Sequence, residues 1–111
     1  MAKLGTLTLT GASGSTYDFV VYGADTTWNE GVMCVYYVSE RTEKSDGTGT
    51  HSNIYVGQTE DIKDRFDDHH KQRCFEAHGY NAISVLIESN EFARLAIEGD
   101  LIDALNPPCN D

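Results

Sequence analysis

The stretch NIYVGQTEDIKDRFDDHH, Asn53–His70, contains the change from strand to helix that decides how this chain folds. Its first residues, NIYVG, are apolar, aromatic and β-branched, which favours a strand. From Glu60 onward the apolar residues recur at helical spacing, Thr59 is a suitable N-cap, and acidic residues favour the positive start of a helix. The side chains expected on the inward side of this helix are Ile62, Phe66, His69 and Arg73.

The segments on either side predict further strands and a second, shorter helix. Apolar and polar residues alternate on both sides of the GASGS turn, so residues 5–23 predict a β-hairpin. Residues 31–41 are rich in β-branched and aromatic side chains and predict a strand, and 42–52 are polar and predict an exposed loop. Residues 74–79 predict a short helix, and the alternating pattern of 81–88 predicts a third strand of the central sheet.

The last helix is expected over residues 89–105, with Ser89 or Asn90 as its N-cap and the prolines that follow as its end. Together these elements predict one compact α+β domain, in which a small antiparallel three-stranded sheet is flanked by helices. Residues 31–111 would form this domain, and residues 1–30 would add an N-terminal β-hairpin.

The charge of the chain argues against an ordinary nucleic-acid-binding surface. The 111 residues carry a formal net charge of −10. Proteins that bind nucleic acids normally present a basic surface, because neutralising phosphates supplies their non-specific affinity. No apolar run approaches the roughly 20 residues of a membrane-spanning helix, so the sequence predicts a soluble cytoplasmic protein without a membrane partner.

The three cysteines, Cys34, Cys74 and Cys109, stand at unrelated spacings. An odd number without a CxxC pair favours free thiols in a reducing compartment over a disulfide framework. An alternative is a zinc site, since one continuous helix would bring His70, Cys74 and His78 to the same face. A glycine just beyond His78 is a helix-stop signal and no fourth ligand is evident, which argues against this site.

Two charged residues are expected on the inward faces of their helices. Glu98 lies on the same side of the last helix as its leucines, and Arg65 falls between apolar residues of the earlier helix. Desolvating an unpaired carboxylate is costly, so Glu98 pairs with a cation, is neutralised, or binds a metal. Arg65 is a candidate for that cation; alternatively, its planar guanidinium binds a phosphate.

The order of the tyrosines and polar residues resembles that of the GIY-YIG nuclease family. CVYYV at 34–38 resembles the first motif of the family, with Tyr36 as its tyrosine, and YVG at 55–57 resembles the second, with Tyr55. A cysteine in place of the first motif's glycine and a long connection between these strands are the departures. The resemblance covers about residues 31–111. It continues, in order, with Arg65, His69, Glu98 and Asn110.

The resemblance implies a metal-dependent endonuclease that hydrolyses phosphodiester bonds in DNA. Glu98 would bind Mg²⁺ or Mn²⁺, and Arg65 would stabilise the charge that develops in the transition state. Asn110 would brace the site through hydrogen bonds.

The same resemblance leaves the activation of the attacking water open among three residues. Tyr36 or Tyr55 would orient or deprotonate it, provided that neighbouring positive charge lowers the ordinary tyrosine pKa of about 10. His69 is an alternative base, since the ordinary pKa of histidine lies closer to neutrality.

The acidity of the chain modifies what is expected of its partners. It predicts weak, salt-sensitive affinity for non-specific DNA, and a partner protein or structured substrate that brings the DNA to the site. The alternative function is a catalytically idle domain of the same fold that acts as an acidic protein-interaction module.

Overall fold

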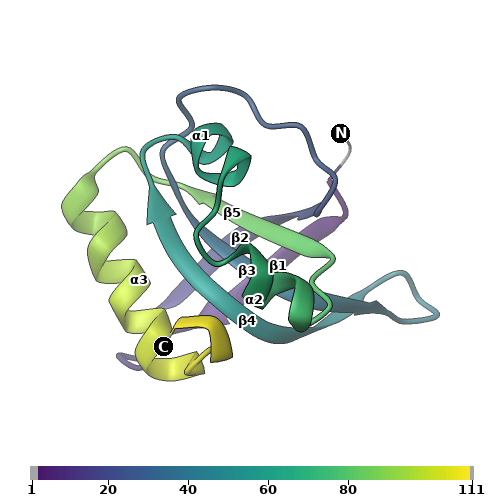
Figure 1. The fold of residues 1–111 in the computed structure, drawn as a ribbon. Coiled ribbons are helices and arrows are strands. Elements are labelled where there is room, and N and C mark those ends of the chain that lie inside the picture. The colour runs from purple at the N-terminus through teal and green to yellow at the C-terminus, as the bar shows by residue number, and fades with distance from the viewer. Residues whose placement is uncertain (1–2, 111) are drawn as a thin grey trace.

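The computed structural model describes residues 3–110, which form a five-stranded antiparallel sheet with helices on both faces (Figure 1). The strands lie in the order β1-β2-β5-β3-β4. They are β1 (Gly5–Thr10), β2 (Thr16–Gly23), β3 (Cys34–Glu43), β4 (Gly49–Thr59) and β5 (Ala82–Ile87). The helices are α1 (Ile62–Asp67), α2 (Gln72–Ala77), α3 (Glu91–Leu105) and the 3₁₀ helix η1 (Pro108–Asn110). The predicted α+β class with an antiparallel sheet is confirmed.

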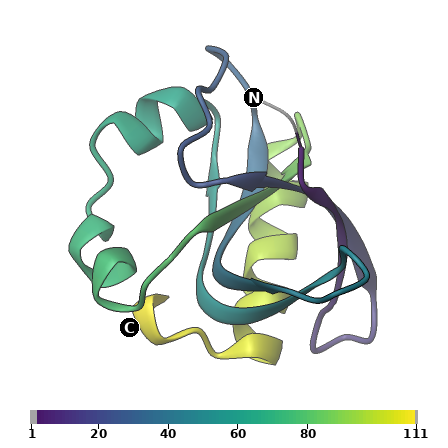
Figure 2. The same ribbon diagram turned by 90° about the vertical axis from the view of Figure 1, so that its right-hand side faces the viewer.

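β3 lies at the centre of the core, between β5 and β4. Its first six residues, CVYYVS, are all buried, because both faces of the strand are covered. Cys34, Tyr36 and Val38 pack with residues of α1 and α2, whereas Val35 and Tyr37 pack with residues of α3. Figure 2 shows the sheet between these two helical layers.

The N-terminal hairpin is part of the same sheet, because β2 pairs with β5, and this enlarges the predicted three-stranded sheet. Helix α3 also contacts the hairpin turn. The Asp100 carboxylate accepts hydrogen bonds from the Ser13 amide at 2.8 Å and from the Tyr17 hydroxyl at 2.7 Å. The turn approaches so closely that a Cβ atom on Gly11 would lie 2.0 Å from Asp100 Oδ2. Any side chain at position 11 would therefore displace the Asp100 carboxylate.

The predicted N-cap of the helix after β4, Thr59, is wrong. Asp61 is the N-cap of α1, and its carboxylate accepts a hydrogen bond from the Asp64 amide at 3.2 Å. Thr59 remains the last residue of β4, and its hydroxyl accepts a hydrogen bond from the Asp61 amide at 3.1 Å. The threonine thus supports the turn that precedes the helix.

The predicted continuous helix through Arg73 is also wrong, because α1 ends at Asp67 and α2 is a separate helix. Asp68 has φ −153° and ψ 77°, which interrupts the helical backbone. Adjacent aspartates are poor residues for a helix interior. The break allows the ring of His69 to be buried against Phe75, with ring centroids 4.7 Å apart.

The final helix has the predicted boundaries to within two residues. Asn90 is its N-cap and accepts a hydrogen bond from the Ala93 amide at 3.0 Å. At its other end Asn106 has a left-handed φ of 46° and donates its amide to Ile102 O at 2.8 Å. In the part of the chain from residue 3 to residue 110, no helix is long and apolar enough to cross a membrane.

Two of the three cysteines are not free thiols, which corrects the prediction. Cys74 on α2 and Cys109 in η1 form a disulfide, with Cα atoms 5.9 Å apart and a sequence separation of 35. Cys34 is a buried free thiol in β3. Its burial, opposed in part by the charge of Arg94, raises its pKa to about 12. The pairing depends on how α2 meets the end of the chain, which cysteine spacing does not reveal.

Candidate active site

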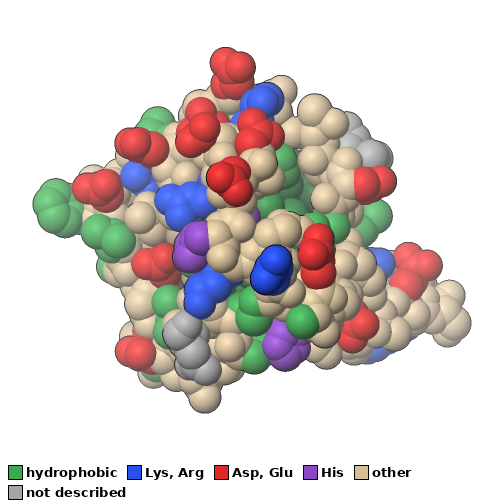
Figure 3. All heavy atoms as spheres, viewed as in Figure 1, with side chains coloured by type: hydrophobic (Ala, Val, Ile, Leu, Met, Phe, Trp, Pro, Cys, Tyr) green, Lys and Arg blue, Asp and Glu red, His purple; other side chains and the backbone are tan. Residues whose placement is uncertain are grey.

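The C-terminal half of β4 forms an edge of the sheet between α3 and the pair α1 and α2 (Figure 1). Figure 3 shows Lys, Arg and His side chains over this part of the surface, whereas many of the Asp and Glu side chains lie around α1. The formal charge of −10 is therefore unevenly distributed. The positive groups lie where the chemistry predicted from the sequence would take place.

Tyr36 and Tyr55 lie on the same face of the sheet, with ring centroids 5.9 Å apart. Tyr36 on β3 pairs with Gly57 on β4, and its ring lies over the glycine. A Cβ atom on Gly57 would come within 2.5 Å of both Cζ and the hydroxyl of Tyr36, and within 2.7 Å of the Tyr55 ring. Because Gly57 has no side chain, the ring of Tyr36 can occupy the space above the backbone of the YVG stretch.

Gly57→Ala is expected to destabilise the protein by about 1–3 kcal/mol, because the added methyl group displaces two buried rings. Urea unfolding measures this change. Gly99→Ala is the matched control, since nothing lies within 4 Å of a Cβ atom built there on α3. Alanine in a helix interior should stabilise the control by up to about 1 kcal/mol. Equal effects of the two substitutions would contradict the close approach of Tyr36.

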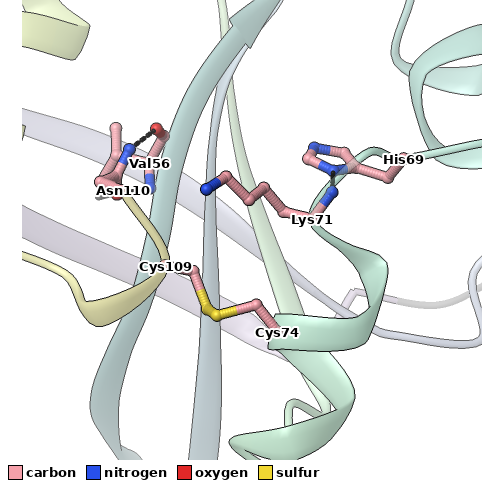
Figure 4. Close-up of a disulfide and its surroundings, with 6 residues drawn as sticks. All are labelled: Val56, His69, Lys71, Cys74, Cys109 and Asn110. Atoms are coloured by element: carbon pink, nitrogen blue, oxygen red, sulfur yellow. Dashed lines mark hydrogen bonds between the residues drawn. A yellow bond between two sulfur atoms is a disulfide. The ribbon is translucent and has the colours of Figure 1, made fainter.

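His69 lies in the break between α1 and α2, and both of its ring nitrogens are hydrogen-bonded. Its Nδ1 accepts a hydrogen bond from the Lys71 amide at 3.0 Å, as Figure 4 shows, and its Nε2 lies 2.7 Å from the Tyr36 hydroxyl. An amide can only donate, so Nδ1 carries no proton and the neutral ring holds its proton on Nε2. His69 therefore donates to the oxygen of Tyr36.

The pKa values of these groups agree with that direction of donation. Burial, with the nearby charges of His70, Arg65 and Lys71, lowers the pKa of His69 to about 4, so the ring is neutral at pH 7. With Nδ1 and Nε2 both engaged, the ring has no free nitrogen with which to accept a proton from water. His69 is arranged to position Tyr36.

Burial and neighbouring charges shift the pKa values of the two tyrosines to different degrees. Burial raises the pKa of Tyr36 far above its ordinary value. Burial and the charge of Glu98 also raise the pKa of Tyr55, but the hydrogen bond with Tyr36 and the charge of Arg65 oppose that rise. The net result is a raised pKa for both tyrosines, so both are neutral phenols at pH 7.

Arg65 and Glu98 approach this cluster from α1 and α3, and each acts electrostatically on both tyrosines. Glu98 is half-buried, and desolvation raises its pKa, while a hydrogen bond from the Gln58 amide and the charge of Arg65 oppose the rise. Among the ion pairs formed within residues 3–110, none joins Arg65 to Glu98. The structural salt bridge considered from the sequence is therefore not formed, and both groups are available to a ligand.

Arg94 belongs to this region but was not selected from the sequence. It is 3% exposed, and it donates from Nε to Gln58 Oε1 and from a terminal nitrogen to Glu88 O, both at 3.0 Å. Arg94 lies one helical turn before Glu98 and therefore on the same inward face of α3. This helical spacing is the sequence pattern that could have identified it. Arg94 and Glu98 both bind Gln58, which ties the position of the carboxylate to β4.

A cavity of about 460 Å³ opens beside these residues, between the end of β4, α1 and the start of α3. Arg65 and Arg94 supply its positive groups. Its acidic lining residues are Glu60, Asp61, Asp64 and Glu91. A cavity with both signs of charge suits a ligand that combines phosphates with a cation better than it suits an anion alone.

Asn110 completes the edge of β4 with its side-chain amide. Its Oδ1 accepts a hydrogen bond from the Val56 amide, and its Nδ2 donates to Val56 O, both at 2.9 Å (Figure 4). The side chain thereby replaces the neighbouring strand that an edge lacks. Because Val56 lies between Tyr55 and Gly57, this contact holds the tyrosine-bearing part of β4 in place.

Asn110→Ala is expected to lower the free energy of unfolding by about 1–3 kcal/mol, because it leaves the two backbone groups of a fully buried valine without their partner. Chemical denaturation measures the loss. Asn29→Ala, at an exposed loop position, is the control and should change stability by less than about 0.5 kcal/mol. A loss no larger than in the control would show that Val56 finds another partner.

The structure brings the six residues named from the sequence to one edge of the sheet. Tyr36 and His69 are hydrogen-bonded on one face with the Tyr55 ring beside them, Arg65 and Glu98 approach from two helices, and Asn110 holds the strand. Comparison of the chain with protein-family models, curated proteins and solved structures found no match.

Proposed function

We propose that this protein is a metal-dependent endonuclease that hydrolyses phosphodiester bonds in DNA with an active site of the GIY-YIG type. The observation that carries the proposal is the convergence of Tyr55, Arg65 and Glu98 at the β4 edge without a salt bridge between the two charges. Phosphodiester hydrolysis requires such a set: a group that orients water, a cation for the phosphate and a ligand for a metal.

Glu98 would hold the metal ion. A single carboxylate fits Mg²⁺ or Mn²⁺, because Mg²⁺ is usually held by one or two carboxylates and keeps several waters. When bound, the ion would neutralise charge on the phosphate and on the leaving oxygen. The Gln58 amide interacts with the Glu98 carboxylate, and Arg94 donates to the Gln58 side chain, so β4 would help to orient Glu98 toward the ion.

Arg65 and Tyr55 would act on the phosphate and the water. The guanidinium of Arg65 would bind phosphate oxygens and stabilise the charge of the transition state. Tyr55 would orient the attacking water and accept its proton, and the charge of Arg65 opposes the rise that burial and Glu98 cause in its pKa. Neutralisation of Glu98 by a cation would remove one of the causes that raise the pKa of Tyr55.

The formal charge of −10 predicts a weak affinity for DNA. Long-range repulsion would keep non-specific DNA binding weak, and the positive groups at the β4 edge would act only at short range. A structured DNA or a recruiting protein would then bring the substrate to the site.

Incubation of supercoiled, branched and single-stranded DNA with the purified protein tests this function. The expected result is cleavage of at least one substrate with Mg²⁺ or Mn²⁺ and none in EDTA. Identically purified Glu98→Ala protein should be inactive, and the same cleavage by this variant would identify a contaminating nuclease.

A second candidate is the acidic protein-interaction module, which one observation favours. Three apolar side chains at the end of β5 and the start of α3 are exposed: Ile87 at 74%, Phe92 at 83% and Leu95 at 46%. Exposed apolar residues that lie together are a feature of docking surfaces. This candidate predicts no cleavage of any substrate with either metal, so the same assay separates the two functions.

A further inference from the structure

A second group of metal-ligating side chains lies away from Glu98, where α2 meets η1. Cys74 lies on α2, His78 follows it by one helical turn, and Cys109 lies in η1. The His78 amide donates to Cys74 O at 3.2 Å, so the helical turn that aligns these two side chains is complete. One ligand atom from each of the three residues lies within 4.8 Å of the others.

This group differs from the zinc site considered from the sequence, which comprised His70, Cys74 and His78. The break between α1 and α2 turns His70 away, and its ring stacks on His69 with centroids 4.9 Å apart and planes at 11°. Cys109, which is distant in sequence, takes its place in the group. The ligand set changes from two histidines and one cysteine to two cysteines and one histidine.

Two thiolates and one imidazole are a donor set that selects zinc over magnesium or calcium. In a tetrahedral site with Zn–S of about 2.3 Å and Zn–N of about 2.0 Å, ligand atoms lie roughly 3.5–3.8 Å apart. The two sulfurs are bonded to each other in this structure, so they must move apart after reduction to reach this spacing. Rotation of the exposed His78 side chain can move its ring nitrogen by the remaining distance of about 1 Å.

We propose that, in the reduced protein, Cys74, His78 and Cys109 bind one Zn²⁺ ion, with water in the fourth position. An external dithiol reduces the protein by supplying two electrons and two protons. The Cys74–Cys109 bond breaks to give two thiols, and the external dithiol is oxidised to its own disulfide. Zinc binding then releases both thiol protons and leaves two thiolates on the metal. This site does not depend on the proposed endonuclease.

The disulfide and the zinc ion would be alternative links between α2 and η1. Figure 4 shows that Cys109 and Asn110 are neighbours in η1, and that Asn110 is the residue that binds Val56 of β4. Either link therefore holds Asn110 against β4. Reduction in the absence of zinc removes the link and leaves that contact to the hydrogen bonds of Asn110 itself.

Cobalt titration of the reduced protein tests the site. The protein is reduced with dithiothreitol, freed of reductant and metal by gel filtration under argon, and titrated with Co²⁺. The expected result is one Co²⁺ per chain, with a thiolate-to-cobalt absorption band and visible bands of tetrahedral cobalt that disappear when Zn²⁺ is added. The oxidised protein should give no such bands. A reduced, folded protein that binds neither metal would overturn the proposal.

His78→Ala is the decisive variant, because the side chain is exposed and its removal leaves the core intact. Loss of a ligand should weaken zinc binding by at least about 100-fold, since even loss of a ligand's supporting partner costs 10–100-fold. His70→Ala is the matched control and should bind as wild type does. Equal weakening by the two variants, or weakening by His70→Ala alone, would reject Cys74, His78 and Cys109 as the ligand set.

Discussion

Replacing Glu98 with glutamine is expected to reduce the rate of metal-dependent DNA cleavage by about 10³-fold, because the amide has no charge with which to hold a divalent ion. The shape of the side chain is retained, and its oxygen can still accept the hydrogen bond from the Gln58 amide. Desolvation already raises the pKa of Glu98, so a neutral amide should not reduce stability. Single-turnover nicking of the preferred DNA and thermal unfolding measure the two quantities.

Asp103→Asn is the control for Glu98→Gln. It makes the same change of charge on the same helix, at an exposed position. It should change the cleavage rate by less than about twofold, since water and salt screen the field of an exposed charge. Wild-type activity in Glu98→Gln would place the metal ligand elsewhere, and a large loss in both variants would indicate an effect of net charge alone.

Acidification from pH 7 to pH 4 is expected to lower the free energy of unfolding by about 3 kcal/mol through His69. The pKa of His69 falls from its ordinary value of 6.5 to about 4 in the folded protein. Between these values the unfolded chain binds a proton that the folded protein does not, so stability is lost as the pH falls through this window. Urea unfolding at intervals from pH 4 to pH 7 measures the slope.

The contribution of His69 is obtained from the difference between wild type and His69→Phe. Two other groups in the window have opposite effects: burial also lowers the pKa of His51, whereas it raises that of Glu98. His69→Phe retains His51 and Glu98, so on acidification its free energy of unfolding should fall by about 3 kcal/mol less than that of wild type. An NMR titration of the wild-type ring provides an independent measurement, and titration of His69 near pH 6.5 would contradict its neutral, Nε2-protonated form.

The strands were predictable because their signal is local. The tyrosines of CVYYV and YVG were placed on neighbouring strands from residue type alone, and their pairing through Tyr36 and Gly57 is the arrangement found. The same kind of reasoning limited the N-cap of the last helix to Ser89 or Asn90, and Asn90 is the one found. Both depend on residues within a turn of one another, where backbone preferences act.

The failures occurred where a distant residue outweighs the local preference. Helical periodicity continued through His69, but the chain breaks there because the ring is buried between Tyr36 and Phe75. Arg94 was overlooked because its partners, Gln58 and the carbonyl of Glu88, lie outside its helix.

By itself, the sequence determined the α+β class and the strand character of β3, since these follow from periodicity and residue type. The residues proposed for catalysis were named from a resemblance to a known family. The tertiary structure decided which groups are joined. It paired Cys74 with Cys109, placed Asn110 on the edge of β4, and left Arg65 and Glu98 without a mutual salt bridge. The physical reason is that such contacts depend on the packing of segments far apart in the chain, and no local pattern specifies which of them will meet.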